Sequence, residues 1–287
     1  MCTCHFSQRK NQGNAMTLTA KTIETSHGSI HVRETSGIGM PVLFIHGNSS
    51  SSAVFRNQME GALGERYRMI APDLPGHGQS GDAIDPDRSY SMEGYADAMT
   101  EVLGQLGVEK AIVFGWSLGG HIGLEMIDRF PGMLGLMITG TPPVSPAEVG
   151  DGFKPSPHMG LAAKQDFTDE DVENYAHSTC GEPFEPFMLD TVARTDGRAR
   201  RLMFEKFSAG TGKDQSVVAA TATVPLAVVN GIDEPFVNTD FVSKVKYANL
   251  WEGETHLIEN SGHAPFWDAQ EKFDPIFARF LESVDQK

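Results

Sequence analysis

The sequence has few cysteines and no long apolar run. Its three cysteines are Cys2, Cys4 and Cys180, which are too few for a disulfide framework and are typical of a reducing compartment. No segment approaches the roughly 18 consecutive apolar residues of a membrane-spanning helix, and residues 1–15 lack the apolar core of a signal peptide. We therefore expect a cytoplasmic protein in which residues 1–15 form an N-terminal tail.

Positive charge is also scarce. The chain has 23 Lys and Arg residues against 38 Asp and Glu residues, so its formal net charge is −15 at pH 7. This acidic balance argues against nucleic acid or an anionic membrane as a partner. With 287 residues, 40% hydrophobic and 21% charged, the chain is large enough for one α/β domain with an insertion.

The most informative stretch is a Gly-x-Ser-x-Gly motif over residues 115–119. An apolar strand over Ala111–Phe114 precedes it, and a helical apolar pattern follows it as far as Phe130. This succession is typical of a nucleophile elbow, in which Ser117 projects from a strained turn. The glycines fit this interpretation, because a Cβ at position 115 or 119 would collide with the adjoining strand or helix. The alternative is a tight turn whose serine merely caps the helix.

A base for Ser117 follows much later in the chain. A serine hydroxyl is a weak nucleophile until a neighbouring base takes its proton, and imidazole exchanges protons near neutral pH. His263 follows the last predicted strand in a Ser-Gly-His run and is the expected base. We interpret His27 and His31 as surface residues, and we expect His121, just after the elbow, to pack or cap.

The acid that orients His263 has two candidates, Asp233 and Glu234, which are neighbours after a predicted strand. A carboxylate is needed to fix the tautomer of the imidazole and to stabilise its charged form. Only one of the two can reach His263, because adjacent side chains after a strand point in different directions. With either acid, the order of nucleophile, acid and base is that of an α/β-hydrolase.

A second strand, Pro41–Ile45, ends in a His-Gly-Asn run that is followed by four serines. In an α/β-hydrolase, a loop in this place supplies one backbone donor of the oxyanion hole, and the residue after the nucleophile supplies the other. We therefore expect the backbone N–H groups of Asn48 and Leu118 to bind the oxyanion. The alternative is a flexible serine loop without a catalytic role.

The remaining pattern predicts an α/β protein. Strands and helices alternate up to about residue 143, the alternation lapses over 144–223, and it resumes at 224. We predict the α/β-hydrolase fold, in which residues 16–143 and 224–287 form a mostly parallel eight-stranded sheet with helices, and residues 144–223 form a helical cap. The other predicted elements are a hairpin over Lys21–Glu34, strands at Tyr67–Ala71, Leu134–Ile138, 224–230 and Glu254–Glu259, and helices at Met92–Leu106, near 169–178, near 187–208 and at Phe273–Val284.

No cofactor or metal motif has the context that it needs. Gly76, Gly78 and Gly81 match the spacing of a dinucleotide fingerprint, but Pro86 and other turn residues follow where a helix should begin. His-x-His and His-Glu-x-x-His runs are absent from the sequence, and Cys180 has no cysteine near it. We expect no cofactor and no metal site.

Together these motifs resemble those of the capped α/β-hydrolases. The resemblance runs from about Met16 to the end, and it rests on the runs at 46–48, 73–78 and 261–263 and on the elbow. More narrowly, the chain is similar to the α/β-hydrolase-type N-acyl-homoserine lactonases, which destroy bacterial quorum-sensing signals without a metal. The narrower likeness rests on the overall sequence, on the glutamate of the Gly-Ile-Asp-Glu-Pro run and on the loop over 48–52.

This resemblance implies a serine hydrolase of the lactone ester in N-acyl-homoserine lactones, with a small-molecule ester or lactone as its partner. The Gly-x-x-Asp-Pro register of the superfamily selects Glu234 as the acid. The family's dehalogenases and epoxide hydrolases use an aspartate nucleophile, so Ser117 argues against those activities. Two other functions stay open: a carboxylesterase or C–C bond hydrolase with the same triad, and a ligand receptor that turns over slowly.

Within the predicted cap, Tyr175 stands in an otherwise acidic, helical stretch. We expect its hydroxyl to point into the substrate pocket and to form a hydrogen bond with an amide or lactone oxygen of the ligand. The alternative is a tyrosine that packs the cap and keeps its hydroxyl in water.

Because the sequence has no cluster of metal ligands, lactone hydrolysis should survive prolonged chelation. The rate is measured before and after dialysis against a chelator, with a zinc-dependent hydrolase treated in parallel as the control. Loss of activity that added zinc restores would contradict a metal-independent serine mechanism.

Overall fold

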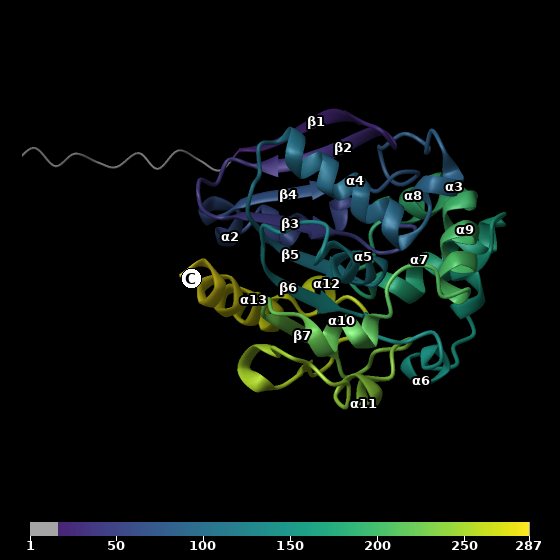
Figure 1. Cartoon of the computed structure of the whole chain (residues 1–287). Helices are drawn as coiled ribbons and strands as arrows, with labels where there is room; N and C mark the ends of the chain where they lie inside the picture. The colour runs from purple at the N-terminus through teal and green to yellow at the C-terminus, as the bar shows by residue number, and fades with distance from the viewer. Residues whose placement is uncertain (1–16, 287) are drawn as a thin grey trace, which may run out of the picture.

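The computed structural model describes residues 17–286, so the predicted tail lies outside the described residues. Its centre is one eight-stranded sheet of order β1-β2-β4-β3-β5-β6-β7-β8 (Figure 1). Only the β1–β2 and β2–β4 pairs are antiparallel, which confirms the predicted mostly parallel sheet. The strands are β1 Leu18–Thr25, β2 Gly28–Thr35, β3 Pro41–Ile45, β4 Arg68–Pro72, β5 Ala111–Trp116, β6 Met133–Thr139, β7 Leu226–Gly231 and β8 His256–Ile258.

Helices cover both faces of this sheet (Figure 1). In β5, Val113 packs with α4 and α5, whereas Ile112 and Phe114 pack with α12 and α13 on the opposite face, as the period of a strand requires. Within residues 17–286 no helix is long and apolar enough to cross a membrane. The helices outside the 144–223 segment are η1 Ser52–Phe55, α1 Arg56–Met59, α2 Ala62–Arg66, α3 Pro86–Ser89, α4 Met92–Gln105, α5 Leu118–Met126, α11 Thr239–Val242, η3 Trp251–Gly253, α12 Pro265–Asp268 and α13 Gln270–Asp285.

A helical segment lies between β6 and β7. Its residues, such as Met159 and Met203, line a cavity together with loops that follow β3, β5 and β6, so the segment lies over the carboxyl ends of the parallel strands. The helical stretch predicted near 187–208 is two helices, because Asp196 interrupts it and caps the second one. The elements are α6 Val149–Gly152, η2 Met159–Ala163, α7 Asp169–Cys180, α8 Pro186–Arg194, α9 Gly197–Ser208 and α10 Gln215–Thr221.

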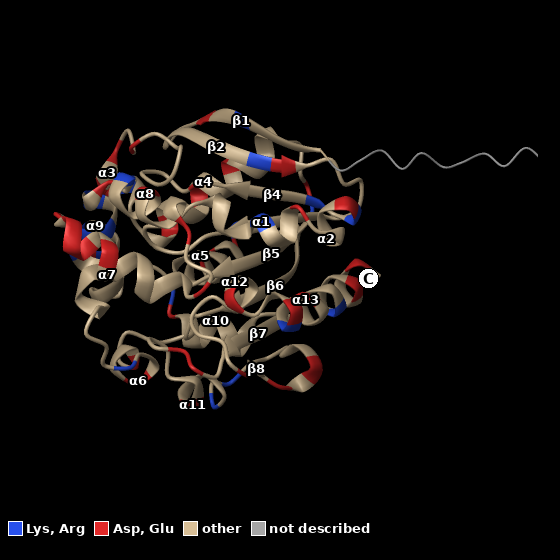
Figure 2. Cartoon of the chain, turned by 180° about the vertical axis from the view of Figure 1, so that it is seen from behind, with Lys and Arg blue, Asp and Glu red and all other residues tan. Residues whose placement is uncertain are grey.

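Helix α7 has one acidic, exposed face and one buried face. Its first turn carries Asp169 and Glu170 at the surface, where Figure 2 shows red segments beside α9. Tyr175 and Cys180 face inward and are almost fully buried. Helical spacing therefore turns Tyr175 away from the acidic residues that surround it in the sequence.

One interpretation of the histidines is wrong. His27 is fully buried at the turn of the β1–β2 hairpin, where its Nδ1 lies 2.8 Å from the Ser89 hydroxyl. Hairpin turns usually face water. Here the segment that contains α3 covers this turn, and that packing cannot be seen in the local sequence.

The elbow depends on a very close approach of three backbone segments. A Cβ on Gly115 would overlap the carbonyl of Gly119, and a Cβ on Gly119 would overlap the carbonyl of Ile45 at the end of β3. Between them Ser117 adopts φ +54°, a conformation that L-residues rarely take. The prediction that a side chain at either glycine would collide with its neighbours is confirmed.

Gly119→Ala should therefore destabilise the protein by about 1–3 kcal/mol, because β3 must move to make room for the methyl group. Gly104→Ala is the matched control: this exposed glycine of α4 has open space around it, so alanine should be neutral or should stabilise by up to about 1 kcal/mol. Unfolding in urea measures both variants. Equal free energies of unfolding would contradict the close approach.

Candidate active site

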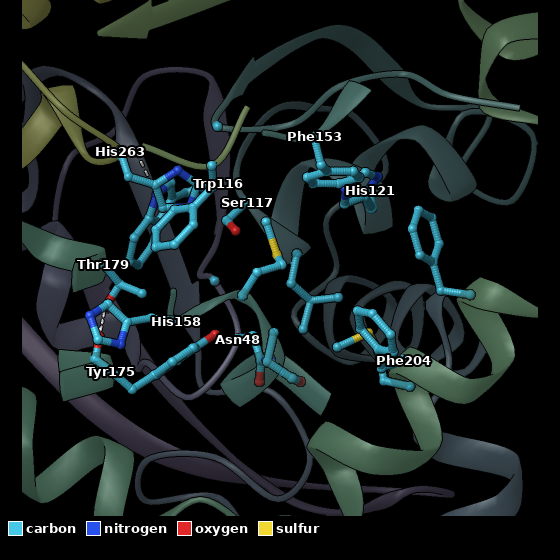
Figure 3. Close-up of a pocket in the computed structure, with 18 of the residues that line it drawn as sticks. Asn48, Trp116, Ser117, His121, Phe153, His158, Tyr175, Thr179, Phe204 and His263 are labelled. Atoms are coloured by element: carbon cyan, nitrogen blue, oxygen red, sulfur yellow. Dashed lines mark hydrogen bonds between the residues drawn. The ribbon is translucent and has the colours of Figure 1, made fainter. Parts of the chain in front are cut away.

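Ser117 lies at the floor of a cavity of about 290 Å³, between β5 and α5 (Figure 3). Thr141 supports the strained turn by donating a hydrogen bond to the Ser117 carbonyl at 2.7 Å. Ser117 also precedes the first turn of α5, where free N–H groups and the helix dipole favour negative charge.

His263 lies beside Ser117 in the same cavity (Figure 3). Its Nδ1 is 2.8 and 2.9 Å from the two carboxylate oxygens of Glu234. A carboxylate only accepts hydrogen bonds, so Nδ1 carries the proton, and Nε2 keeps the lone pair that a general base needs. The structure thus brings together the predicted nucleophile, base and acid.

The two candidate acids occupy different environments. The side chain of Glu234 is 0% exposed, whereas Asp233 is exposed and has no contact with His263 among the described interactions. Burial alone would raise the pKa of Glu234, but the imidazole of His263 and hydrogen bonds from the N–H groups of Phe236 and Val237 hold it below its usual value. Glu234 is therefore ionised at neutral pH despite its burial.

The predicted oxyanion donors border the same cavity. Leu118 is the first residue of α5, so its N–H has no partner inside that helix. Gly47 lets the loop approach the nucleophile closely, since a Cβ there would lie 3.2 Å from Cβ of Ser117. The side chain of Asn48 is engaged by a 3.0 Å hydrogen bond to the Ala162 carbonyl and by Ser49, which leaves its backbone N–H as the group for an oxyanion.

Tyr175 also lines the cavity, and its ring reaches from α7 toward Asn48 (Figure 3). Burial raises the pKa of its hydroxyl, and the charge of Arg200 and a hydrogen bond from the Asn48 side chain oppose that rise only in part. The hydroxyl thus stays protonated and can donate a hydrogen bond. Its position matches the predicted orientation, and contact with a ligand remains a prediction.

Sequence reasoning missed two residues that hold the His263 turn. Trp116, a variable position of the elbow motif, donates from Nε1 to the His263 carbonyl at 2.9 Å. Asp268 accepts hydrogen bonds from the Ser261 hydroxyl at 2.5 Å and from the Gly262 N–H at 2.8 Å. Only Asp268 had a local signal, as an acid close to the Ser-Gly-His run.

No group of three or more metal-ligating side chains occurs within residues 17–286.

Comparison with known proteins agrees with this geometry. The model of the alpha/beta hydrolase family matches residues 42–274. A crystal structure of N-acyl homoserine lactonase AidH with N-butanoyl homoserine is 65% identical, with a TM-score of 0.93, over 94% of this chain and 98% of that chain. A mutant of AidH complexed with N-hexanoyl homoserine is 64% identical, with the same coverage and TM-score. A 2-hydroxy-6-oxononadienedioate/2-hydroxy-6-oxononatrienedioate hydrolase of a Pseudomonas species is 25% identical over 89% of this chain and 92% of its own length.

The contacts of Glu234 predict how the two neighbouring acids differ in effect. Glu234→Gln removes the charge that stabilises the imidazolium and misorients the ring, so kcat for ester or lactone hydrolysis should fall by up to about 10⁴-fold. Asp233→Asn is the matched control and should keep most of the activity. Steady-state kinetics of the two variants, after circular dichroism has shown that both fold, make the comparison. The reverse ranking would move the acid to Asp233.

Proposed function

The chain belongs to the alpha/beta hydrolase family, and from that premise we propose that it hydrolyses the lactone ester of N-acyl-homoserine lactones. The observation that carries the proposal is 65% identity, over 94% of the chain, to N-acyl homoserine lactonase AidH, whose crystal structure holds N-butanoyl homoserine. That ligand is the corresponding lactone plus one water molecule, so it is the product that such a reaction releases.

In the first half-reaction Ser117 is the nucleophile. Nε2 of His263 takes the proton as the hydroxyl oxygen attacks the lactone carbonyl carbon. The carboxylate of Glu234 stabilises the imidazolium that forms, through the hydrogen bond at Nδ1. The N–H groups of Asn48 and Leu118 bind the negative oxygen of the tetrahedral intermediate, and each such donor contributes about 2.7–4 kcal/mol in comparable sites.

The tetrahedral intermediate collapses when the bond between the carbonyl carbon and the ring oxygen breaks. His263 gives its proton to that oxygen, which becomes a hydroxyl group and stays attached to the homoserine that is now esterified to Ser117. A water molecule then loses a proton to His263 and attacks the ester carbonyl. Ser117 leaves with that proton, and N-acyl-homoserine is released as its carboxylate.

The helical segment over 144–223 is the cap in this proposal, and it supplies the walls that select the substrate. The cavity is lined mainly by apolar side chains, which suits an acyl chain. The hydroxyl of Tyr175 donates a hydrogen bond to an amide or lactone oxygen of the ligand. The position of the side chains around Ser117 supports these roles (Figure 3).

The rival functions have weaker support. The 2-hydroxy-6-oxononadienedioate/2-hydroxy-6-oxononatrienedioate hydrolase of the Pseudomonas species is 25% identical to this chain, whereas the lactonase is 65% identical. A receptor with slow turnover has no need for the ionised Glu234, which the site maintains despite burial through His263 and two backbone N–H groups. Rates on a panel of lactones, aryl esters and C–C hydrolase substrates distinguish a lactonase from an esterase or C–C hydrolase. The turnover number distinguishes an enzyme from a slow receptor.

Ser117→Ala should abolish the reaction without unfolding the protein. We expect the hydrolysis of N-hexanoyl homoserine lactone to fall by a factor of roughly 10³ or more, because members of a triad act as a unit. Mass spectrometry follows the gain of one water by the substrate, and thermal unfolding checks the fold. A variant that opens the ring at nearly the wild-type rate would refute the proposed mechanism.

A further inference from the structure

The cavity has a polar side and an apolar side, and His121 lies on the apolar one. Figure 3 shows His158, Tyr175 and Thr179 on one side of Ser117 and His121 on the other. The wall on this side, here called the apolar branch, includes Phe153, Phe204 and Phe207. The ring of His121 packs against Phe207 with centroids 5.1 Å apart and against Phe153 at 6.2 Å. A polar imidazole therefore stands among apolar side chains.

The contacts of Gln215 fix the tautomer of this imidazole. Nδ1 of His121 lies 2.6 Å from Oε1 of Gln215, while Nε2 of Gln215 donates to the His121 carbonyl at 3.5 Å. Turning the amide over would place its oxygen against that carbonyl, so Oε1 must face the ring. An amide oxygen only accepts, hence Nδ1 of His121 carries the proton and Nε2 carries a lone pair.

Nε2 of His121 is available to a ligand. Gln215 belongs to α10 and is not among the residues that line the cavity, whereas His121 is. The two nitrogens of an imidazole point in widely different directions, so Nε2 points away from α10. Among the described residues no hydrogen bond engages it. Burial lowers the pKa of His121 to about 4, so the ring is neutral at physiological pH and Nε2 accepts hydrogen bonds.

The backbone spacing of Ser117 and His121 along α5 indicates which carbon of an acyl chain meets the imidazole. The N–H of His121 donates to the Ser117 carbonyl, so one turn of α5, a rise of about 6 Å, separates the two residues. In an extended N-acyl-homoserine lactone, C3 of the acyl chain lies five bonds from the lactone carbonyl carbon, which also spans about 6 Å. An extended acyl chain that follows α5 from Ser117 into the apolar branch therefore comes level with the backbone of His121 at about its third carbon.

We propose that Nε2 of His121 accepts a hydrogen bond from a hydroxyl group at C3 of the acyl chain, so that the enzyme selects N-(3-hydroxyacyl)-homoserine lactones over their 3-oxo analogues. This inference rests on the proposed lactonase function and adds the class of acyl chain. A hydroxyl at C3 donates to the lone pair, whereas a 3-oxo group presents its own lone pairs and leaves both acceptors unpaired. An unsubstituted chain makes neither interaction and ranks between the two.

The test compares three lactones of equal chain length: N-(3-hydroxyhexanoyl), as both enantiomers, N-hexanoyl and N-(3-oxohexanoyl) homoserine lactone. For the wild type, kcat/KM for the better 3-hydroxy enantiomer should exceed that for the 3-oxo substrate by about tenfold or more, because sites that bind a hydroxyl discriminate strongly against analogues that lack it. This ranking needs no variant and is decisive by itself: a ratio near one overturns the inference.

Two variants locate the selectivity. In His121→Phe with Gln215→Met, both polar partners are removed together, so no buried group is left unpaired, and the ratio should fall to within about threefold. His158→Phe makes the same change on the other side of the cavity and should keep the wild-type ratio. An unchanged ratio in the double variant overturns the role of His121. Hydrolysis of all three lactones at equal rates overturns only this inference, whereas failure to hydrolyse any of them overturns the proposed function as well.

Discussion

The close approach of β3, β5 and α5 at the elbow is the constraint on which the site depends. Gly119 lies so near the carbonyl of Ile45 that no side chain fits between the helix and the strand. This contact places the start of α5 beside the loop that follows β3, so Leu118 and Asn48 border the same cavity as Ser117. The strained φ of Ser117 costs about 1–3 kcal/mol, which the packing of a fully buried strand on both sides can hold in place.

The charge states of the buried groups also depend on their neighbours in the site. A carboxylate with a fully buried side chain is unfavourable unless charges and donors surround it, and Glu234 has the imidazole of His263 and two backbone N–H groups. His121 lies one helical turn from the nucleophile, and its own burial lowers its pKa to about 4. Its imidazole is therefore neutral and accepts hydrogen bonds. Two buried histidines of one cavity thus differ in function because one faces a carboxylate and the other faces an amide.

Local sequence patterns predicted the parts of the site that local backbone geometry determines. The elbow, the strand before it and the loop after β3 follow from glycine spacing and apolar runs, and the Gly-x-x-Asp-Pro register distinguished Glu234 from Asp233 by counting. The parts that were missed join residues far apart in the chain. Burial of His27 depends on Ser89, the Nε1 of Trp116 reaches His263, and the tautomer of His121 depends on Gln215, so none of these contacts leaves a periodic signal. The break between α8 and α9 was missed because the apolar pattern continues across the capping residue Asp196.

The proposed mechanism requires that the hydroxyl of Ser117 forms the bond to the substrate. Titration with a fluorophosphonate, which reacts irreversibly with an activated serine, tests it most directly. Peptide mass mapping measures the fraction of Ser117 that is labelled, and the rate of opening of N-hexanoyl homoserine lactone is measured on the same samples. We expect the activity to fall in proportion to the label on Ser117 and to reach zero at one equivalent. Protein that is fully labelled at Ser117 and still opens the lactone would contradict the mechanism.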